Sequence, residues 1–347
     1  MYIKRILLFI VLAGLVVGGI FSYIVYNAVF SPNTSFNNEE AFVFIPSDAD
    51  FIEVKKQVEP LLENVETFEQ IAKRKGYVAN IKAGKYAIKK GMNNNEIINS
   101  LRANNIPVNV SFNNQETIAD LAGRIAAQIE PDSASLLAAF NDISFIKDKG
   151  FTEETKLAMY IPNSYEFFWN TDSEEFRERM AKEYSRFWNN ERLKKAEIQG
   201  LNPEEVVTLA SLVHKETAKV DERPKVAGLY LNRLKRGMLL QADPTVIYAL
   251  KKDSNDFNLV VKRVLYKDLE LDSPYNTYKY AGLPPGPIAM PDISAIDAVL
   301  NPEKHDYLYF VANVENFGYH KFAKTLAQHN RNKVQYIQWI NAQKINR

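Results

Sequence analysis

The chain has 347 residues, enough for about two domains. Its 46% hydrophobic and 24% charged residues can fill a core, which excludes disorder over the whole length. The 43 basic and 42 acidic residues give a net charge of +1, so no nucleic-acid partner is expected, and the absence of cysteine excludes disulfides, thiolate metal sites and a cysteine nucleophile.

The N-terminal segment is set apart by its lack of charge. Lys4 and Arg5 precede an uncharged run that continues to Ser31, and the apolar core of that run, residues 6–25, is long enough to cross the ~30 Å hydrocarbon layer of a membrane as a helix. No clear Ala-x-Ala-like cleavage site follows, which favours an uncleaved anchor over a cleaved signal peptide. Because the next basic residue is Lys55, the positive-inside rule predicts a single-pass protein of the cytoplasmic (inner) membrane, with its N-terminus in the cytoplasm and the rest outside. The predicted parts are a cytoplasmic tail (1–5), a transmembrane signal-anchor (6–30) and a polar linker (31–40).

A compact α+β unit is predicted next, over residues 41–105. Apolar runs and helical spacing give the order strand, helix, helix, strand, helix. Asn93 and Glu96 form the pattern of a capping box at the start of the third helix. The expected ranges are 41–45, 48–62, 65–75, 85–88 and 94–101.

Residues 106–347 are predicted to form a larger mixed α/β domain. Its expected strands lie at 108–112 and 238–241, and its expected helices at 116–129, 133–140, 173–196, 203–216, 222–236 and 246–250. Asp221 is expected to cap the helix at 222–236. Further on, residues 307–311 and a strand with His320 and Phe322 form a predicted hairpin, followed by a helix that begins at Leu326.

Glu216 is the most promising residue for chemistry. Steps of three and four place Val206, Leu209, Val213 and Glu216 on one stripe of the helix. A carboxylate among apolar neighbours loses hydration, so its pKa rises above the ~4.3 of a free glutamate, which prepares it to act as a general acid. The alternative is an ordinary glutamate at a fraying helix end, and periodicity alone favours that alternative.

Two later stretches bring polar groups that suit a sugar. Gln241, Asp243 and Thr245 share one predicted strand-to-helix corner, where they can converge on a ligand, although Asp243 could simply cap its helix. In residues 275–278, two tyrosines flank Asn and Thr, and aromatic rings can stack on the C–H faces of pyranoses. An ordinary surface loop is the alternative there, and the Gly-Pro run at 282–287 predicts a stiff loop.

These stretches together resemble the endolytic murein transglycosylase (YceG-like) family. The resemblance covers about residues 160–330 and is specific, because several long motifs occur in a fixed order. The matching motifs are Leu209–Thr217, Arg236–Tyr248, Tyr275–Tyr278, Gly282–Ala289, Tyr307–Ala312, His320–Phe322 and Leu326–Asn330. A weaker match at residues 81–86 and 91–92 resembles the end of the family's LysM-like subdomain.

The resemblance implies a fold and a set of site residues. The expected fold is α+β: an N-terminal transmembrane helix, a LysM-like subdomain (41–105) and a mixed α/β catalytic domain (106–347) with a helix-borne glutamate. Glu216 aligns with the family's catalytic residue. The implied substrate-binding residues are Gln241, Asp243, Thr245, Tyr275, Asn276, Tyr278, His320 and Asn330. No cofactor or metal is expected.

The implied reaction is lytic cleavage of peptidoglycan glycan strands. The family cleaves the β-1,4 bond between N-acetylmuramic acid and N-acetylglucosamine inside the strand and leaves a 1,6-anhydro end, which would terminate nascent strands. Cell-wall synthases are the expected protein partners. Three alternatives remain open: a non-catalytic peptidoglycan-binding protein, a two-carboxylate hydrolase that pairs Glu216 with Asp243, and a membrane-tethered scaffold.

Overall fold

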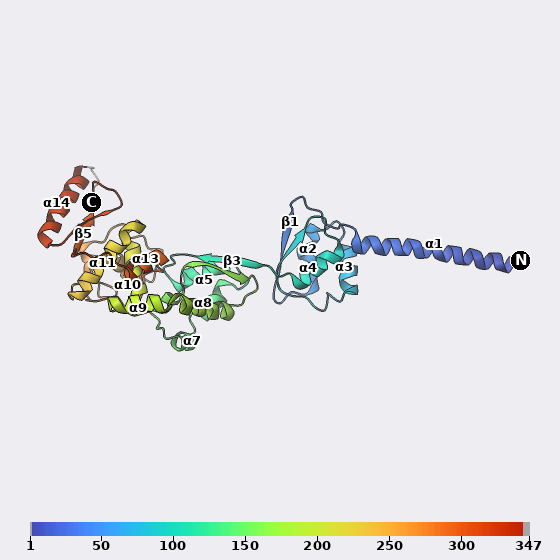
Figure 1. Ribbon diagram of the computed structural model, residues 1–347, viewed down its shortest axis with the longest axis horizontal. Helices are drawn as coiled ribbons and strands as arrows, with labels where there is room; N and C mark the ends of the chain where they lie inside the picture. The colour runs from blue at the N-terminus through green and yellow to red at the C-terminus, as the bar shows by residue number, and fades with distance from the viewer. Residues whose placement is uncertain (1, 343–347) are drawn as a thin grey trace. The chain divides into compact units, whose positions relative to one another are not determined.

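A computed structural model of the chain describes residues 2–342 and divides them into two compact units (Figure 1). The first unit takes the residues up to Val110 together with Gln128–Pro131 and Tyr165–Asp172. The second takes Ser111–Ala127, Asp132–Ser164 and the residues from Ser173 onward. Met1 of the expected tail and residues 343–347 of the expected catalytic domain lie outside the described residues.

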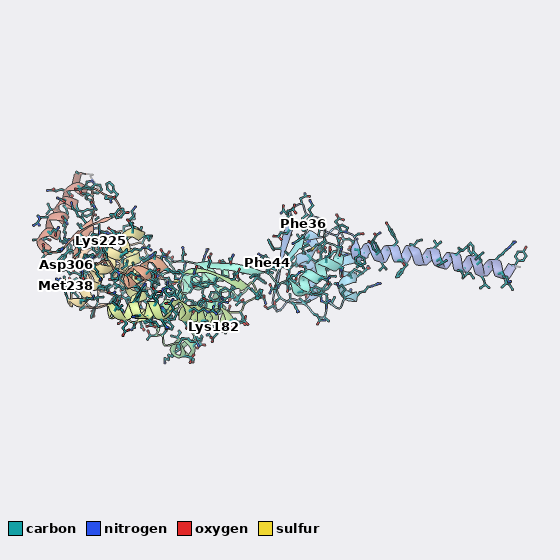
Figure 2. The ribbon with its side chains drawn as sticks, in the orientation of Figure 1. Phe36, Phe44, Lys182, Lys225, Met238 and Asp306 are labelled. Atoms are coloured by element: carbon teal, nitrogen blue, oxygen red, sulfur yellow. The ribbon has the colours of Figure 1, made fainter. Side chains whose placement is uncertain are left out.

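The apolar N-terminal segment forms one helix, α1 (Tyr2–Phe30), which includes the basic residues expected in a tail. Its mean hydropathy is 2.5 over its most apolar stretch, and within residues 2–342 it is the one helix long and apolar enough to cross a membrane. Along most of α1 the side chains are exposed (Figure 2). The last turn of α1 meets the rest of the first unit, where Ala28 and Val29 pack against the core and Asn94 donates to the Ala28 carbonyl at 2.8 Å.

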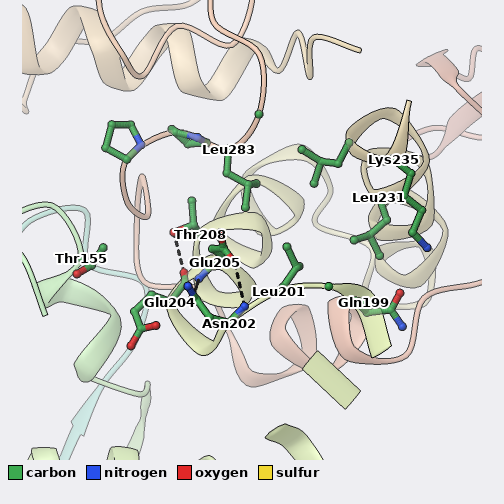
Figure 3. A pocket seen from close by; sticks show the side chains of 15 residues that line it. Thr155, Gln199, Leu201, Asn202, Glu204, Glu205, Thr208, Leu231, Lys235 and Leu283 are labelled. Atoms are coloured by element: carbon green, nitrogen blue, oxygen red, sulfur yellow. Dashed lines mark hydrogen bonds between the residues drawn. The ribbon is translucent and has the colours of Figure 1, made fainter. Parts of the chain in front are cut away.

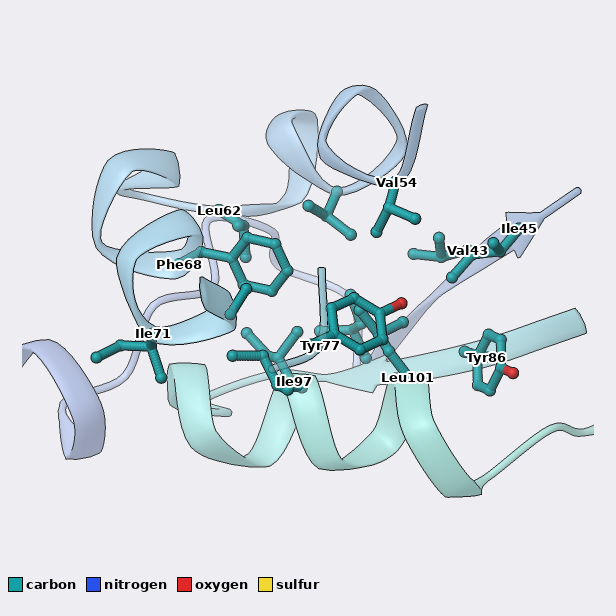
Figure 4. Close-up of a cluster of buried hydrophobic side chains, with 14 residues drawn as sticks. Val43, Ile45, Val54, Leu62, Phe68, Ile71, Tyr77, Tyr86, Ile97 and Leu101 are labelled. Carbon is teal, nitrogen blue, oxygen red and sulfur yellow. The ribbon is translucent and has the colours of Figure 1, made fainter. Parts of the chain in front are cut away.

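The core of the first unit confirms the predicted order of strand, two helices, strand and helix. Strand β1 (Glu40–Ile45) pairs antiparallel with β2 (Gly84–Lys89), with Val43 opposite Tyr86. The predicted capping box of Asn93 and Glu96 is present. The helices are α2 (Phe51–Val58), continued by the 3₁₀ turn η1 (Glu59–Leu61), α3 (Val65–Arg74) and α4 (Asn94–Ala103). Their apolar faces enclose one cluster around Phe68 and Tyr77 (Figure 4).

The segment expected as a linker is held on this unit by hydrogen bonds. Asn33 is buried, and its side chain donates to Asn94 Oδ1 at 2.7 Å and to the Asn64 carbonyl at 2.9 Å. Its backbone N–H bonds to Met92, and the N–H of Ser35 bonds to Leu61. Polarity suggested a free linker, but buried amides can be satisfied by the protein as well as by water.

The second unit is mostly helical. Strands β3 (Pro107–Phe112) and β4 (Asn163–Phe168) pair in a two-stranded sheet. Each strand includes residues of both units. Strand β4 was not predicted. Strands β5 (Tyr309–Ala312) and β6 (His320–Ala323) form the predicted hairpin, with Ala312 opposite His320. The helices are α5 (Ile118–Ala126), α6 (Ser133–Phe140), α7 (Ile143–Asp148), α8 (Ser173–Phe187), α9 (Asn190–Gln199), α10 (Pro203–Glu216), α11 (Arg223–Lys235), α12 (Asp243–Asp253), α13 (Ile293–Leu300) and α14 (Leu326–Ala342), with 3₁₀ turns η2 (Lys156–Met159), η3 (Val220–Glu222) and η4 (Tyr266–Glu270).

Three local predictions for the second unit are wrong. The helix expected over 173–196 breaks into α8 and α9, because the side chain of Asn189 caps a new helix by accepting from the Arg192 N–H. Residues 238–241 are not a strand, and Gln241 has a left-handed backbone with φ of 49°. Asp221 does not cap α11; its carboxylate accepts hydrogen bonds from the Tyr319 hydroxyl.

Helix α10 lies at the centre of the second unit. It packs against α11 and α13, and every residue from Val206 to Val213 is buried. The helix is therefore covered on all sides, and not only along the predicted stripe. This burial fixes the helix whose last residue is Glu216.

Candidate active site

The ends of α10 determine where the carboxyl of Glu216 is held. At the start a capping box is present: Asn202 and Glu205 exchange backbone-to-side-chain hydrogen bonds of 2.8 Å. At the end, Thr217 turns the chain into an extended conformation with φ of −136° and ψ of 130°. Glu216 is half-buried, at the point where the covered helix reaches the surface of the second unit.

The surroundings raise the pKa of Glu216 to about 7. Burial is the largest cause, because a poorly hydrated site disfavours the charged form. The positive charge of His320 lowers this pKa, and the negative charge of Asp243 raises it. A 3.2 Å hydrogen bond from the Tyr230 hydroxyl and the charge of Arg233 also lower it. At neutral pH about half of the Glu216 carboxyls therefore carry a proton that could be donated.

Glu216 lines a hollow of about 350 Å³ that lies entirely in the second unit. This volume is at the lower end of the ~300–1,000 Å³ range typical of ligand sites. Helices α10, α11, α12 and α14 and strand β5 contribute most of its lining, and Gln241 and Tyr278 line it from loops. Its polar and aromatic lining residues include Glu216, Arg233, Gln241, Asp243, Tyr278, Tyr309, His329, Lys333 and Tyr336.

Three of the predicted substrate-binding residues gather at this hollow with Glu216: Gln241, Asp243 and Tyr278. The Tyr278 hydroxyl donates a 2.6 Å hydrogen bond to Asp243. Burial and Asp243 raise the pKa of Tyr278, so the phenol keeps its proton as a donor. The left-handed turn at Gln241 is held by its N–H, which bonds to the Thr277 carbonyl at 3.1 Å.

Three other predicted residues do not line the hollow, because their polar atoms are used inside the protein. Thr245 has no exposed surface, and its hydroxyl donates to the Ala242 carbonyl at 2.7 Å. Asn276 has no exposed surface either, and its amide donates to two backbone carbonyls at 2.9 and 2.8 Å. Tyr275 is buried, and the centre of its ring lies 4.7 Å from that of Tyr248. The structure thus places these residues in the packing that supports Tyr278.

The last two predicted residues, His320 and Asn330, do not line the hollow either, but they differ in how close they lie to Glu216. The backbone N–H of His320 donates to Glu222 at 2.6 Å, and its Nδ1 lies 2.9 Å from the other carboxylate oxygen. It is close enough to Glu216 to influence the pKa of that carboxyl. Asn330 is exposed and does not line the hollow, whereas its neighbour His329 does.

Several residues of the hollow were not predicted as site residues. Arg233 lines the hollow from α11, and Tyr230, one helical turn earlier, does not line it but donates to Glu216, so the inward face of that helix carried a usable signal. Tyr309 and His329 belong to the matching motifs and stack with ring centres 5.4 Å apart. Lys333 lies one helical turn beyond His329 on α14, outside the matching motifs.

A larger hollow of about 580 Å³ occupies another part of the second unit (Figure 3). Its lining includes the start of α10 and residues 282–285, so the stiff Gly-Pro loop does not border Glu216. Its two carboxylates already have partners, because Glu205 caps α10 and Glu204 accepts from Tyr184. Within residues 2–342 no group of three or more histidine and acidic side chains is arranged to hold a metal ion.

Comparison with known proteins gives one family model, curated relatives and a solved structure that match most of the chain. A model of the YceG-like family matches residues 43–335. The endolytic murein transglycosylase of Bacillus subtilis (strain 168) is 32% identical over 345 residues, which covers 93% of this chain and 91% of that protein. The endolytic murein transglycosylase of Streptococcus pneumoniae (serotype 2, strain D39) is 28% identical over 94% of this chain, which spans 64% of that protein. A 2.6 Å crystal structure of a protein described as YceG-like, from Listeria monocytogenes, is 30% identical, with a TM-score of 0.55 and coverage of 85% of this chain and 99% of that one.

Proposed function

The chain belongs to the YceG-like family, and we propose that it is a lytic transglycosylase that cleaves peptidoglycan glycan strands internally. The names of its relatives support the class of reaction and the substrate. The observation that carries the proposal is Glu216: a carboxyl at the end of a buried helix, with a pKa near 7, in a hollow lined with tyrosine, amide and charged side chains.

The proposed bond is the β-1,4 link between N-acetylmuramic acid and N-acetylglucosamine. Protonated Glu216 donates its proton to the bridging oxygen, which leaves with the N-acetylglucosamine side of the strand as a hydroxyl. The resulting carboxylate then accepts the proton of the muramic C6 hydroxyl, whose oxygen attacks the anomeric carbon. The products are a 1,6-anhydro end and a new hydroxyl end, and Glu216 is protonated again. One carboxyl therefore suffices, whereas most glycosidases need two.

The neighbours of Glu216 have distinct roles in this proposal. The negative charge of Asp243 favours the protonated carboxyl that begins the reaction. The Tyr230 hydroxyl stabilises the carboxylate that exists between the two proton transfers. Tyr309 and Tyr278 offer an apolar ring and a polar tip to a sugar in the hollow.

We further propose that α1 anchors the protein in the cytoplasmic membrane with its N-terminus inside. The apolar length of α1 and the position of Lys4 and Arg5 before the apolar run support this orientation. The unit at residues 41–105 is proposed to be LysM-like, which its strand-helix-helix-strand-helix order supports. Cell-wall synthases are the proposed partners at the membrane surface, because they make the strands that this activity would end.

The mass of the newly formed glycan end tests the function. Purified full-length protein in detergent is incubated with isolated glycan strands, and the fragments are analysed by mass spectrometry. An end that is lighter by one water than a reducing end is expected. Reducing ends would instead indicate a hydrolase that uses Glu216 with Asp243, and bound but uncut strands would indicate a binding protein.

A further inference from the structure

Glu222 is a buried carboxylate, and each of its two oxygens contacts His320. Only 4% of its side chain is exposed. One oxygen accepts the backbone N–H of His320 at 2.6 Å, and the other lies 2.9 Å from His320 Nδ1. Burial by itself would raise the pKa of Glu222, but the hydrogen bonds from His320, its charge and the Thr217 hydroxyl hold the pKa below its ordinary value. Glu222 is therefore charged at neutral pH and can only accept hydrogen bonds.

This arrangement decides where the His320 proton is. Because an ionised carboxylate has no proton to give, Nδ1 of the imidazole must carry the hydrogen of the 2.9 Å bond. Nε2 is then the remaining nitrogen, and it has no hydrogen-bond partner among residues 2–342. The His320 side chain is 15% exposed.

Aromatic packing connects His320 to the site of the proposed reaction. The ring of Phe310, which lines the hollow, meets the His320 ring edge-on with centres 4.7 Å apart. Phe310 also packs edge-on against Tyr230 at 6.1 Å, and Tyr230 donates to Glu216. Thr217, which bonds to Glu222, directly follows Glu216 in the chain. Glu222 thus contacts both the end of the helix that carries Glu216 and the strand that carries His320.

From these contacts we infer that Glu222 is a positioning residue for the reaction proposed above. It fixes the tautomer and the orientation of His320, so that Nε2 is the nitrogen presented to the glycan beside Glu216. Glu222 itself does not touch the substrate. The inference rests on the proposed function. Among residues 2–342, the other charged groups of this region do not hydrogen-bond to the His320 ring. Those groups are Glu216, Arg233, Asp243, Lys219 over the Tyr319 ring, Asp221 on the Tyr319 hydroxyl, and Lys321 with Glu315.

The first test measures the tautomer directly and needs no substrate. Imidazole ¹⁵N spectra of the full-length protein in detergent resolve its 4 histidines, and the His320→Gln variant identifies the His320 signals. In spectra taken at a pH where the imidazole is neutral, we expect Nδ1–H in the unchanged protein. In Glu222→Gln, the amide oxygen can still accept the His320 backbone N–H, but its NH₂ group then faces Nδ1, so the tautomer should change to Nε2–H. An Nε2–H tautomer in the unchanged protein would overturn the inference whether or not any variant folds.

The second test separates positioning from general stability. Glu222→Gln should lower kcat for anhydro-end formation by about 10- to 100-fold, the loss typical when a carboxylate that orients a metal-bound histidine is removed. If Glu222 acts through His320, the double variant with His320→Ala should cleave no more slowly than His320→Ala alone. Asp221→Asn is the matched control, because this neighbouring carboxylate is exposed and its hydrogen-bond partner within residues 2–342 is Tyr319, so the variant should cleave at the normal rate.

Two results separate this inference from the proposed function. Full cleavage by Glu222→Gln, or a double variant that is further impaired, would refute the positioning role. If the unchanged protein formed no anhydro ends at all, the proposed function would fail, while the tautomer measurement would still decide whether Glu222 holds His320.

Discussion

The substitution Glu216→Gln removes the proposed acid while it keeps the size and most of the hydrogen bonding of the side chain. The amide can still accept from the Tyr230 hydroxyl, but it cannot protonate a leaving oxygen. General acid–base catalysis contributes about 10²–10⁴-fold. Because the same carboxyl serves both proton transfers in the proposed reaction, the loss should be at or above the top of that range. Strand binding should persist, since Tyr278 and Tyr309 are unchanged.

The same substitution should change how stability depends on pH. The rise in the Glu216 pKa from 4.5 to about 7 corresponds to about 3 kcal/mol in favour of the neutral form in the folded chain. Between about pH 4.5 and pH 7 the folded chain retains a proton that the unfolded chain releases, so the unchanged protein loses stability as pH rises through this window. Glutamine has no proton to lose. Since partial exposure screens the effect, the variant should be more stable than the unchanged protein above pH 7 by about 1–3 kcal/mol, and equal to it below pH 4.5.

Three measurements on purified protein check these expectations together: anhydro-end formation, co-sedimentation with glycan strands, and urea unfolding at pH 4.5 and pH 8. Glu197→Gln is the control, because Glu197 is exposed on α9 and outside the hollow, and it should change none of the three. A well-folded Glu216→Gln variant that still cleaves would refute the acid–base role. Equal stability of variant and unchanged protein at pH 8 would refute the raised pKa.

Further substitutions test the causes of the Glu216 pKa and the packing of the loop beside it. Tyr230→Phe removes a hydrogen bond that lowers this pKa, so the alkaline limb of the kcat/KM profile should move to higher pH. Asp243→Asn removes a charge that raises it, so the limb should move to lower pH, and shifts in the same direction would contradict this electrostatic account. Asn276→Ala leaves two backbone carbonyls without their donor in a fully buried position and should cost about 2–4 kcal/mol in urea unfolding, whereas Asn330→Ala, at an exposed position, should cost almost nothing.

Local sequence patterns were sufficient for most elements and for Glu216. The capping boxes at Asn93 and Asn202 are present because both partners lie within one turn of the chain. The apolar run that becomes α1 is equally local. Glu216 stands out in the sequence because it follows the apolar residues of a strongly capped helix and lies in a specific motif, and its role as the acid stays a proposal. Helix α10 is buried on all sides and not only along the predicted row of apolar residues. The apolar environment expected for the Glu216 carboxyl agrees with its raised pKa.

The rest of the hollow depends on contacts between distant segments, which local patterns do not encode. Nothing near Tyr275 or Asn276 in the chain shows that their side chains turn inward, since the same polar and aromatic types also suit a ligand. On α14 the sequence pointed to Asn330, whereas His329 and Lys333 line the hollow, because the motif does not show which face of the helix turns toward Glu216. The break at Asn189 shows a different limit, because one capping side chain outweighs continuous helical spacing.

The surroundings of Asp243 bear on whether one carboxyl or two carry out the reaction. Its carboxylate accepts a 2.6 Å hydrogen bond from Tyr278, and its charge raises the pKa of Glu216. Both features suit a fixed negative charge that keeps its neighbour protonated. In a two-carboxylate hydrolase Asp243 would instead act as a base or nucleophile, and its replacement by Asn would abolish cleavage at every pH. If Asp243 only sets the protonation of Glu216, the Asp243→Asn variant should recover much of its activity at lower pH. It should also still form anhydro ends, because the nucleophile is the C6 hydroxyl of the sugar and not a second carboxylate.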